Sequence, residues 1–208
     1  MGKIKELLVG FEDEALVEEV KKELAAGTDP QAILTECQEG MVEIGNLFSA
    51  GEMFVSDLMM SAVMFKAVGE EVLPHIQKSG AGASLGKVVL GTVKDDIHDI
   101  GKDIVHSMLA AAGFEVIDVG VDAAPEVFIK ALQDSGAKVL GLSCLLASCY
   151  GSILATVEAV KAAGLRDSVK IIIGGGPIDE NVVAYSGADT MGADAQATVN
   201  FCKEVYGA

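Results

Sequence analysis

The second half of this 208-residue chain contains four short, almost uninterrupted apolar runs: KVVLGT, FEVIDVG, AKVLGLS and VKIIIGG. Each run is followed by a stretch that is compatible with a helix. Strands that are apolar on both faces must be covered on both faces, as in a parallel sheet between two layers of helices. A fifth, shorter strand is expected near residues 188–191. The sequence therefore predicts a doubly wound α/β domain over residues 87–208.

The first 76 residues have a helical rhythm instead. Apolar residues recur every three to five positions along residues 7–24, and similar stripes follow at 33–44 and 54–72. The last helix is expected to end near Pro74. Short turns separate these segments, so we predict a four-helix bundle over residues 1–76. The segment 77–86, QKSGAGASLG, is small, polar and without apolar periodicity, and we interpret it as a linker.

The formal net charge of −16 disfavours binding to nucleic acids or anionic membranes, because both would repel the chain. It suits a protein that docks onto more basic partners. Neither an apolar run of about 18 residues nor a signal-peptide core is seen, so we expect a cytoplasmic protein. The four cysteines lack CxxC spacing and are expected to be buried, reduced thiols.

Ligands of doubly wound sheets bind at the carboxyl ends of the strands. The first strand leads into GTVKDDIHDIG at residues 91–101, the third ends in Ser-Cys-Leu at 143–145, and the fourth ends in three glycines at 174–176. We expect these three segments to converge on one crevice.

His98 is the one histidine at a strand end, and carboxylates flank it at positions 96 and 99. A neutral imidazole is a good transition-metal ligand, and a carboxylate on its other nitrogen fixes the tautomer and raises the basicity. Asp96 could be that partner, and Ser143 could extend the hydrogen-bond chain. A solvated ion pair is an equally good interpretation of a His beside an Asp in a loop. Zinc is disfavoured, since neither a further suitable His nor a spaced Cys pair accompanies His98.

The glycine run at 174–176 also has two interpretations. It could be a tight turn into a helix, or its missing side chains could let a flat or extended ligand lie against the backbone. It does not match GxGxxG, and no Walker-type lysine follows it. Nucleotide-phosphate binding is therefore unsupported.

Taken together, these residues resemble the cobalamin-binding motif DxHxxG…SxL…GG of corrinoid-dependent methyltransferases and mutases. Asp96-x-His98-x-x-Gly101 is followed after 41 residues by Ser143-x-Leu145, and after 28 more by Gly174-Gly175. The resemblance implies a flavodoxin- or Rossmann-like domain in which the tail of cobalamin or a related corrinoid enters a slot. By that analogy His98 is the lower axial ligand of cobalt, Asp96 and Ser143 modulate its protonation, and the glycines make room for the tail.

Residues 41–55 resemble the helical cap that covers the reactive face of cobalt in methyltransferase corrinoid proteins. Phe48 aligns with a cap phenylalanine, and Val55 stands where a leucine is commoner; both could equally be bundle core. The chain departs from the family pattern at two further positions. Asp95 replaces a glycine before the motif aspartate, and Ala147 replaces a threonine that is often bonded to the corrin.

The resemblance implies a corrinoid methyl carrier, the corrinoid subunit of a methyltransferase system, which is not expected to be catalytic without partner methyltransferases. A substrate-specific methyltransferase would transfer a methyl group to Co(I), and a second would move it from methyl-Co(III) to a thiol or a tetrahydropterin such as tetrahydrofolate. A reductive activator would rescue Co(II). The alternatives are the cobalamin subunit of an adenosylcobalamin-dependent mutase, a B12-sensing module, and a flavodoxin-like module without cobalt.

Overall fold

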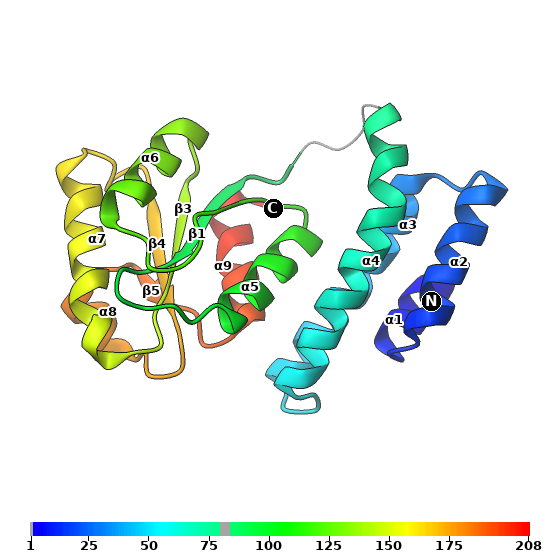
Figure 1. The fold of residues 1–208 in the computed structure, drawn as a ribbon, viewed down its shortest axis with the longest axis horizontal. Coiled ribbons are helices and arrows are strands. Elements are labelled where there is room, and N and C mark those ends of the chain that lie inside the picture. The colour runs from blue at the N-terminus through cyan, green and yellow to red at the C-terminus, as the bar shows by residue number, and fades with distance from the viewer. Residues whose placement is uncertain (1, 80–83) are drawn as a thin grey trace. The chain divides into compact units, whose positions relative to one another are not determined.

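The computed structural model describes residues 2–79 and 84–208, which divide into two compact units. Of these residues, 2–79, 84 and 111–113 form the first unit, and 85–110 and 114–208 form the second. The first unit is helical and the second is α/β (Figure 1), which confirms the predicted fold class. In the first unit, α3 packs against α1 and α4, and α2 packs against α4. The helices are α1 (Lys3–Val9), α2 (Asp13–Ala26), α3 (Pro30–Ser49) and α4 (Val55–Ser79).

Two details of the bundle differ from the predictions. The apolar stripe along residues 7–24 belongs to two helices, because the chain turns at Phe11, whose φ is +56°. The turn lets Leu8 of α1 and Leu16 of α2 both be fully buried. The prediction that the last helix ends near Pro74 is wrong, since α4 continues to Ser79 with Pro74 inside it. A proline removes one helical hydrogen bond without forbidding the helix, and the preceding turn is held by the fully buried Val72.

Residues 77–79 of the expected linker are therefore helical, and residues 80–83 lie outside the described residues. Among the residues that the structure describes, no helix is both long and apolar enough to cross a membrane.

The second unit contains a five-stranded parallel sheet in the order β2-β1-β3-β4-β5, which is the flavodoxin-like arrangement. The fifth strand is shorter than expected and comprises only its last two residues. The strands are β1 (Lys87–Thr92), β2 (Glu115–Asp118), β3 (Val139–Ser143), β4 (Lys170–Gly174) and β5 (Thr190–Met191).

Helices cover both faces of the sheet, as its apolar strands require: α5 and α9 on one face, and α6, α7 and α8 on the other (Figure 1). On the second face, Phe128 of α6 and Ile153 of α7 are completely buried against strand residues such as Leu140. The helices are α5 (Ile100–Ala111), α6 (Pro125–Ser135), α7 (Tyr150–Ala162), α8 (Glu180–Ser186) and α9 (Ala195–Tyr206).

The sheet register brings the predicted site segments to one level. Thr92 pairs with Ser143, and Ser143 pairs with Gly174, so β1, β3 and β4 end side by side. Strand order reverses between β1 and β3, where the chain leaves β1 toward one face of the sheet and β3 toward the other. This switch point is where open α/β sheets bind their ligands.

Candidate functional site

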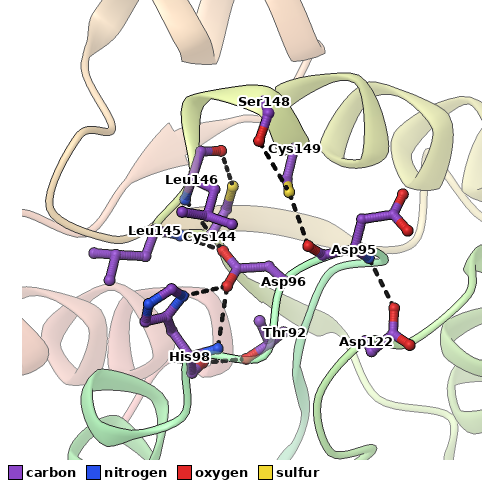
Figure 2. A network of polar contacts seen from close by, with 10 residues as sticks. All are labelled: Thr92, Asp95, Asp96, His98, Asp122, Cys144, Leu145, Leu146, Ser148 and Cys149. Carbon is purple, nitrogen blue, oxygen red and sulfur yellow. Dashed lines mark hydrogen bonds and ion pairs between the residues drawn. The ribbon is translucent and has the colours of Figure 1, made fainter.

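The carboxylate of Asp96 is the centre of the loop between β1 and α5, and it is completely buried. Its Oδ1 accepts from the His98 backbone N–H at 3.1 Å and lies 2.6 Å from His98 Nδ1. Its Oδ2 accepts from the backbone N–H groups of Leu145 and Leu146, at 2.6 and 3.2 Å (Figure 2). Asp96 thus joins the loop after β1 to the loop after β3.

The hydrogen bonds that Asp96 accepts determine the protonation state of its carboxyl group. Burial alone would raise the pKa of the carboxyl group, because a charge is poorly solvated there. The hydrogen bonds from Leu145, the His98 ring, and the backbone of His98 and Leu146 outweigh burial and lower the pKa to about 2. Asp96 is therefore an anion at neutral pH, and the proton shared with His98 resides on Nδ1.

The His98 ring is oriented by this contact and remains accessible. Its side chain is 47% exposed, and Nε2 makes no hydrogen bond to any residue in 2–79 or 84–208. Its backbone is held as well, because the buried Thr92 hydroxyl donates to the His98 carbonyl at 2.9 Å. With Nδ1 protonated, the lone pair of Nε2 is free to bind a metal.

A third loop, after β2, supports the Asp96 segment from the other side. The Asp95 N–H donates to the Asp122 carboxylate at 2.8 Å, and the Asp122 N–H donates to the Asp96 carbonyl at 2.8 Å. Lys94 Nζ also lies 2.7 Å from the Asp122 carboxylate. Asp95 has a φ of +70°, so the position where the family pattern has glycine does adopt a left-handed backbone, which aspartate tolerates better than most residues.

The cysteines near the site are buried thiols, as expected, and all four in the chain are free. Cys149 donates its S–H to the Asp95 carbonyl at 3.2 Å, and Cys144 donates to the Leu146 carbonyl at 3.3 Å. Burial, and then the charge of Asp96, raise the pKa of Cys144 to about 11. The Cys144 thiol is therefore neutral, and the hydrogen bonds of both thiols shape the loops.

The expected hydrogen-bond chain from Asp96 to Ser143 is not formed. The Asp96 oxygens are occupied by four N–H groups, and the Ser143 hydroxyl has no hydrogen bond within the described part of the chain. The reason is that the loop after β3 turns its backbone amides, rather than its serine side chain, toward the carboxylate. Ser143 ends β3 beside the site and is partly exposed.

The glycines fall into two groups. Gly175 has a φ of +139°, and a Cβ there would overlap the Cys144 carbonyl, so the protein itself requires glycine. A Cβ on Gly174 would have its nearest neighbour, the Gly192 oxygen, at 3.8 Å, and one on Gly101 would meet nothing within 4 Å. The space beside these two residues is thus open to a ligand.

Exposed apolar side chains occur in both loops that Asp96 joins. Ile97 and Ile100 belong to the loop and to the start of α5, and they are 72% and 59% exposed. Leu145 and Leu146, which follow β3, are 42% and 39% exposed. A flat apolar ligand could cover these side chains while His98 reaches its centre. Among the described residues no group of three or more His, Cys, Asp or Glu side chains could hold a metal ion. His98 could therefore serve only as a single ligand, as an axial position on a macrocyclic metal requires.

In the helical unit, Phe48 is partly buried near the end of α3, and Val55 begins α4 with 51% of its surface exposed. The neighbouring Phe54 is 73% exposed. Val55 is therefore a surface residue of the bundle and not part of its core.

Sequence reasoning missed three contributors to the site: Thr92, Asp122 and the amides of residues 145 and 146. Asp122 follows β2, so the rule that ligands bind at strand ends could have found it. The two amides gave no sequence signal, because every residue type except proline supplies a backbone N–H. The Thr92 hydroxyl gave none either, because its acceptor is a backbone carbonyl.

Comparison with known proteins identifies the family of this chain. A family model described as "B12 binding domain" matches residues 86–200, and a second with the same description matches residues 2–70. Trimethylamine corrinoid protein 2 of Methanosarcina mazei is 35% identical over 96% of this chain and 92% of its own length. A corrinoid protein of Desulfitobacterium hafniense is 36% identical over 100% of this chain and 97% of its own.

Two solved structures share the fold over nearly the whole chain. A cobalamin-binding protein from Desulfitobacterium hafniense has a TM-score of 0.78 and 33% identity, with 97% of this chain and 96% of that chain covered. The methanol:cobalamin methyltransferase complex MtaBC from Methanosarcina barkeri has a TM-score of 0.84 and 25% identity, with 98% and 78% covered. The chain belongs to the B12-binding corrinoid proteins of methyltransferase systems, and its cofactor is cobalamin or a related corrinoid.

Proposed function

We propose that this chain is a methyl carrier that works between two enzymes. A substrate-specific methyltransferase would load the methyl group, and a second would transfer it to a thiol or a tetrahydropterin, with a reductive activator restoring the carrier after oxidation. The observation that carries the proposal is the Asp96–His98 pair, 2.6 Å apart, with Nε2 free at the switch point of the sheet. When bound, the corrinoid supplies a nucleophilic cobalt that can hold the methyl group.

The residues of the chain would bind and tune this cofactor. His98 Nε2 would take the lower axial position, and Asp96 would keep the proton on Nδ1. The open space at Gly101 and Gly174 would receive the cofactor tail beside Gly175, Leu145 and Ser143. By the resemblance of residues 41–55 to corrinoid-protein caps, Phe48 and Val55 would contact the reactive face.

The relatives support a carrier more than a mutase subunit. Several are named trimethylamine or dimethylamine corrinoid proteins, and one solved relative is a complex of a corrinoid protein with its methyltransferase. A cytoplasmic location is part of this proposal, and four buried cysteines without disulfides are in keeping with it.

The test is electron paramagnetic resonance of the protein reconstituted with cob(II)alamin, after labelling with ¹⁵N-histidine. Wild-type protein should show axial nitrogen splitting that changes from the ¹⁴N to the ¹⁵N pattern, because the ligand is a protein histidine. His98→Ala should lose the ¹⁵N splitting, and the matched control His106→Ala, on α5, should keep it. If the label leaves the wild-type splitting unchanged, His98 is not the axial ligand and the proposal fails.

A further inference from the structure

A groove of about 420 Å³ lies on the surface of the helical unit, between α2 and α4, and the site described above does not use it. Its two walls differ in chemistry. The α2 wall carries three carboxylates and the α4 wall carries large apolar side chains: Asp13, Glu14 and Glu18 face Met60, Val63 and Met64.

Part of the apolar α4 wall is exposed to solvent and is not part of the core of the bundle. Met64 is 2% exposed and belongs to the core, but Met60 is 48% and Val63 is 65% exposed. Exposed apolar side chains gathered in a groove commonly mark a site of protein interaction. Methionine suits such a surface, because its flexible side chain adapts to different partners.

The acidic wall indicates the charge of the partner. Among the described residues that line the groove, none is a lysine or an arginine. Lys21, further along α2, is paired with Glu71 at 3.2 Å. The net charge of −16 adds to the local negative potential.

We propose that the groove binds an amphipathic helix of a partner protein, with Lys or Arg facing α2 and aliphatic side chains facing α4. Helices commonly bind in grooves through apolar residues spaced three and four apart. Residues 60–67 of α4 extend for about 10 Å, which matches two turns of such a helix. This inference rests on the proposed function, which identifies the partner as one of the enzymes that bind the carrier.

Binding can be measured on the corrinoid-free protein, so that failure here and failure of cobalt ligation are distinguishable. The probe is a fluorescein-labelled helical peptide of about 14 residues built from Leu, Ala and Lys, ~21 Å long. We expect saturable anisotropy, together with shifts of the Met60 and Met64 methyl signals in NMR spectra. A peptide with Glu in place of each Lys should not bind, since the groove wall would repel it.

The matched variants separate the groove from the general charge of the chain. Asp13→Asn/Glu14→Gln/Glu18→Gln should weaken binding about tenfold, and Val63→Ser about fivefold. Glu39→Gln/Glu158→Gln/Glu180→Gln changes the net charge equally and should weaken binding less than about twofold. Equal losses in the two triple variants, unchanged methionine signals, or binding of the acidic peptide would overturn the proposal. So would self-association of the free protein through this groove in sedimentation experiments. Circular dichroism confirms that each variant is folded.

Discussion

The Asp96–His98 loop and the outer surface of α4 differ in how their side chains are satisfied. In the loop, the buried carboxylate of Asp96 accepts four hydrogen bonds. Hydrogen bonds to backbone groups join the loops that follow β1, β2 and β3. On α4, Val55, Met60 and Val63 are about half exposed or more. The loop is built to hold one ligand geometry, whereas the helix presents apolar surface that has no partner within the bundle.

The Asp96–His98 loop and the outer surface of α4 suit two different requirements of a carrier. A metal ligand must be held in one orientation, and a buried hydrogen-bond network that is fully satisfied provides that. A surface that meets several partners in turn benefits from adaptable side chains that contribute little to folding. Variants of the two regions should therefore differ sharply in their effect on stability.

The largest effect is expected for Gly175→Ala, which should lower the free energy of unfolding by about 4 kcal/mol. Its φ of +139° disfavours a side chain, and the new methyl group would overlap the Cys144 carbonyl. Gly174→Ala should cost less than about 1 kcal/mol, because its methyl group meets nothing closer than 3.8 Å. Urea denaturation of the corrinoid-free variants measures both. Equal free energies of unfolding for the two variants would show that the end of β4 rearranges to accept the methyl group.

Asp96→Asn should cost about 3 kcal/mol, because an amide cannot accept from N–H groups on both of its ends. Its NH₂ group would face either the amides after β3 or the donors of His98. Asp99→Asn, on the exposed side of the same loop, should change stability by less than about 0.5 kcal/mol. Thermal unfolding of the two variants provides the comparison, and a small loss in Asp96→Asn would mean that the network is not the source of the rigidity.

Lowering the pH should gradually remove the stability that the ionised Asp96 carboxylate contributes. The pKa of Asp96 is lowered to about 2 in the folded protein, whereas an unfolded aspartate titrates near 3.9. The folded state therefore binds the proton less tightly, and about 2.5 kcal/mol of stability is present above pH ~4 and is lost as the pH falls toward 2. Urea titrations between pH 5 and 2.5 should show a shallower decline for Asp96→Asn. Parallel declines would assign the acid sensitivity to other groups.

Asp95→Gly should stabilise the protein by up to about 1 kcal/mol, because glycine adopts the φ of +70° without steric cost. Only an exposed contact to Lys94, at 4.0 Å, would be lost, and such pairs contribute little. Asp95→Ala keeps the side-chain Cβ and should instead be destabilising. The melting temperatures of the two variants relative to wild type test this directly.

The smallest effect is expected on the outer surface of α4. Val63→Ala should change the free energy of unfolding by less than about 0.5 kcal/mol, since this side chain is 65% exposed. Val68→Ala, on the same helix but completely buried, should cost about 2 kcal/mol. Urea midpoints of this pair decide whether the exposed apolar residues are free for a partner; similar losses would mean that Val63 contributes to the fold.

The sequence by itself determined the order of the two units and the positions of the strands, and it made Asp96 a candidate partner of His98. Continuous apolar strands and helical stripes are local patterns, so they can be recognised without knowing which residues meet. A carboxylate two residues from a histidine is also close to it in any compact loop. The resemblance of the motif DxHxxG…SxL…GG to that of cobalamin-binding proteins predicted the cofactor.

Only the tertiary structure decided what holds the site in place. The amides of Leu145 and Leu146 lie 49 and 50 positions from Asp96, and they reach its carboxylate only because β1 and β3 are neighbours in a fixed register. The same register leaves the Ser143 hydroxyl out of the network. The turn at Phe11 is likewise set by packing, which overrides a helical stripe when two helices must bury their apolar faces together.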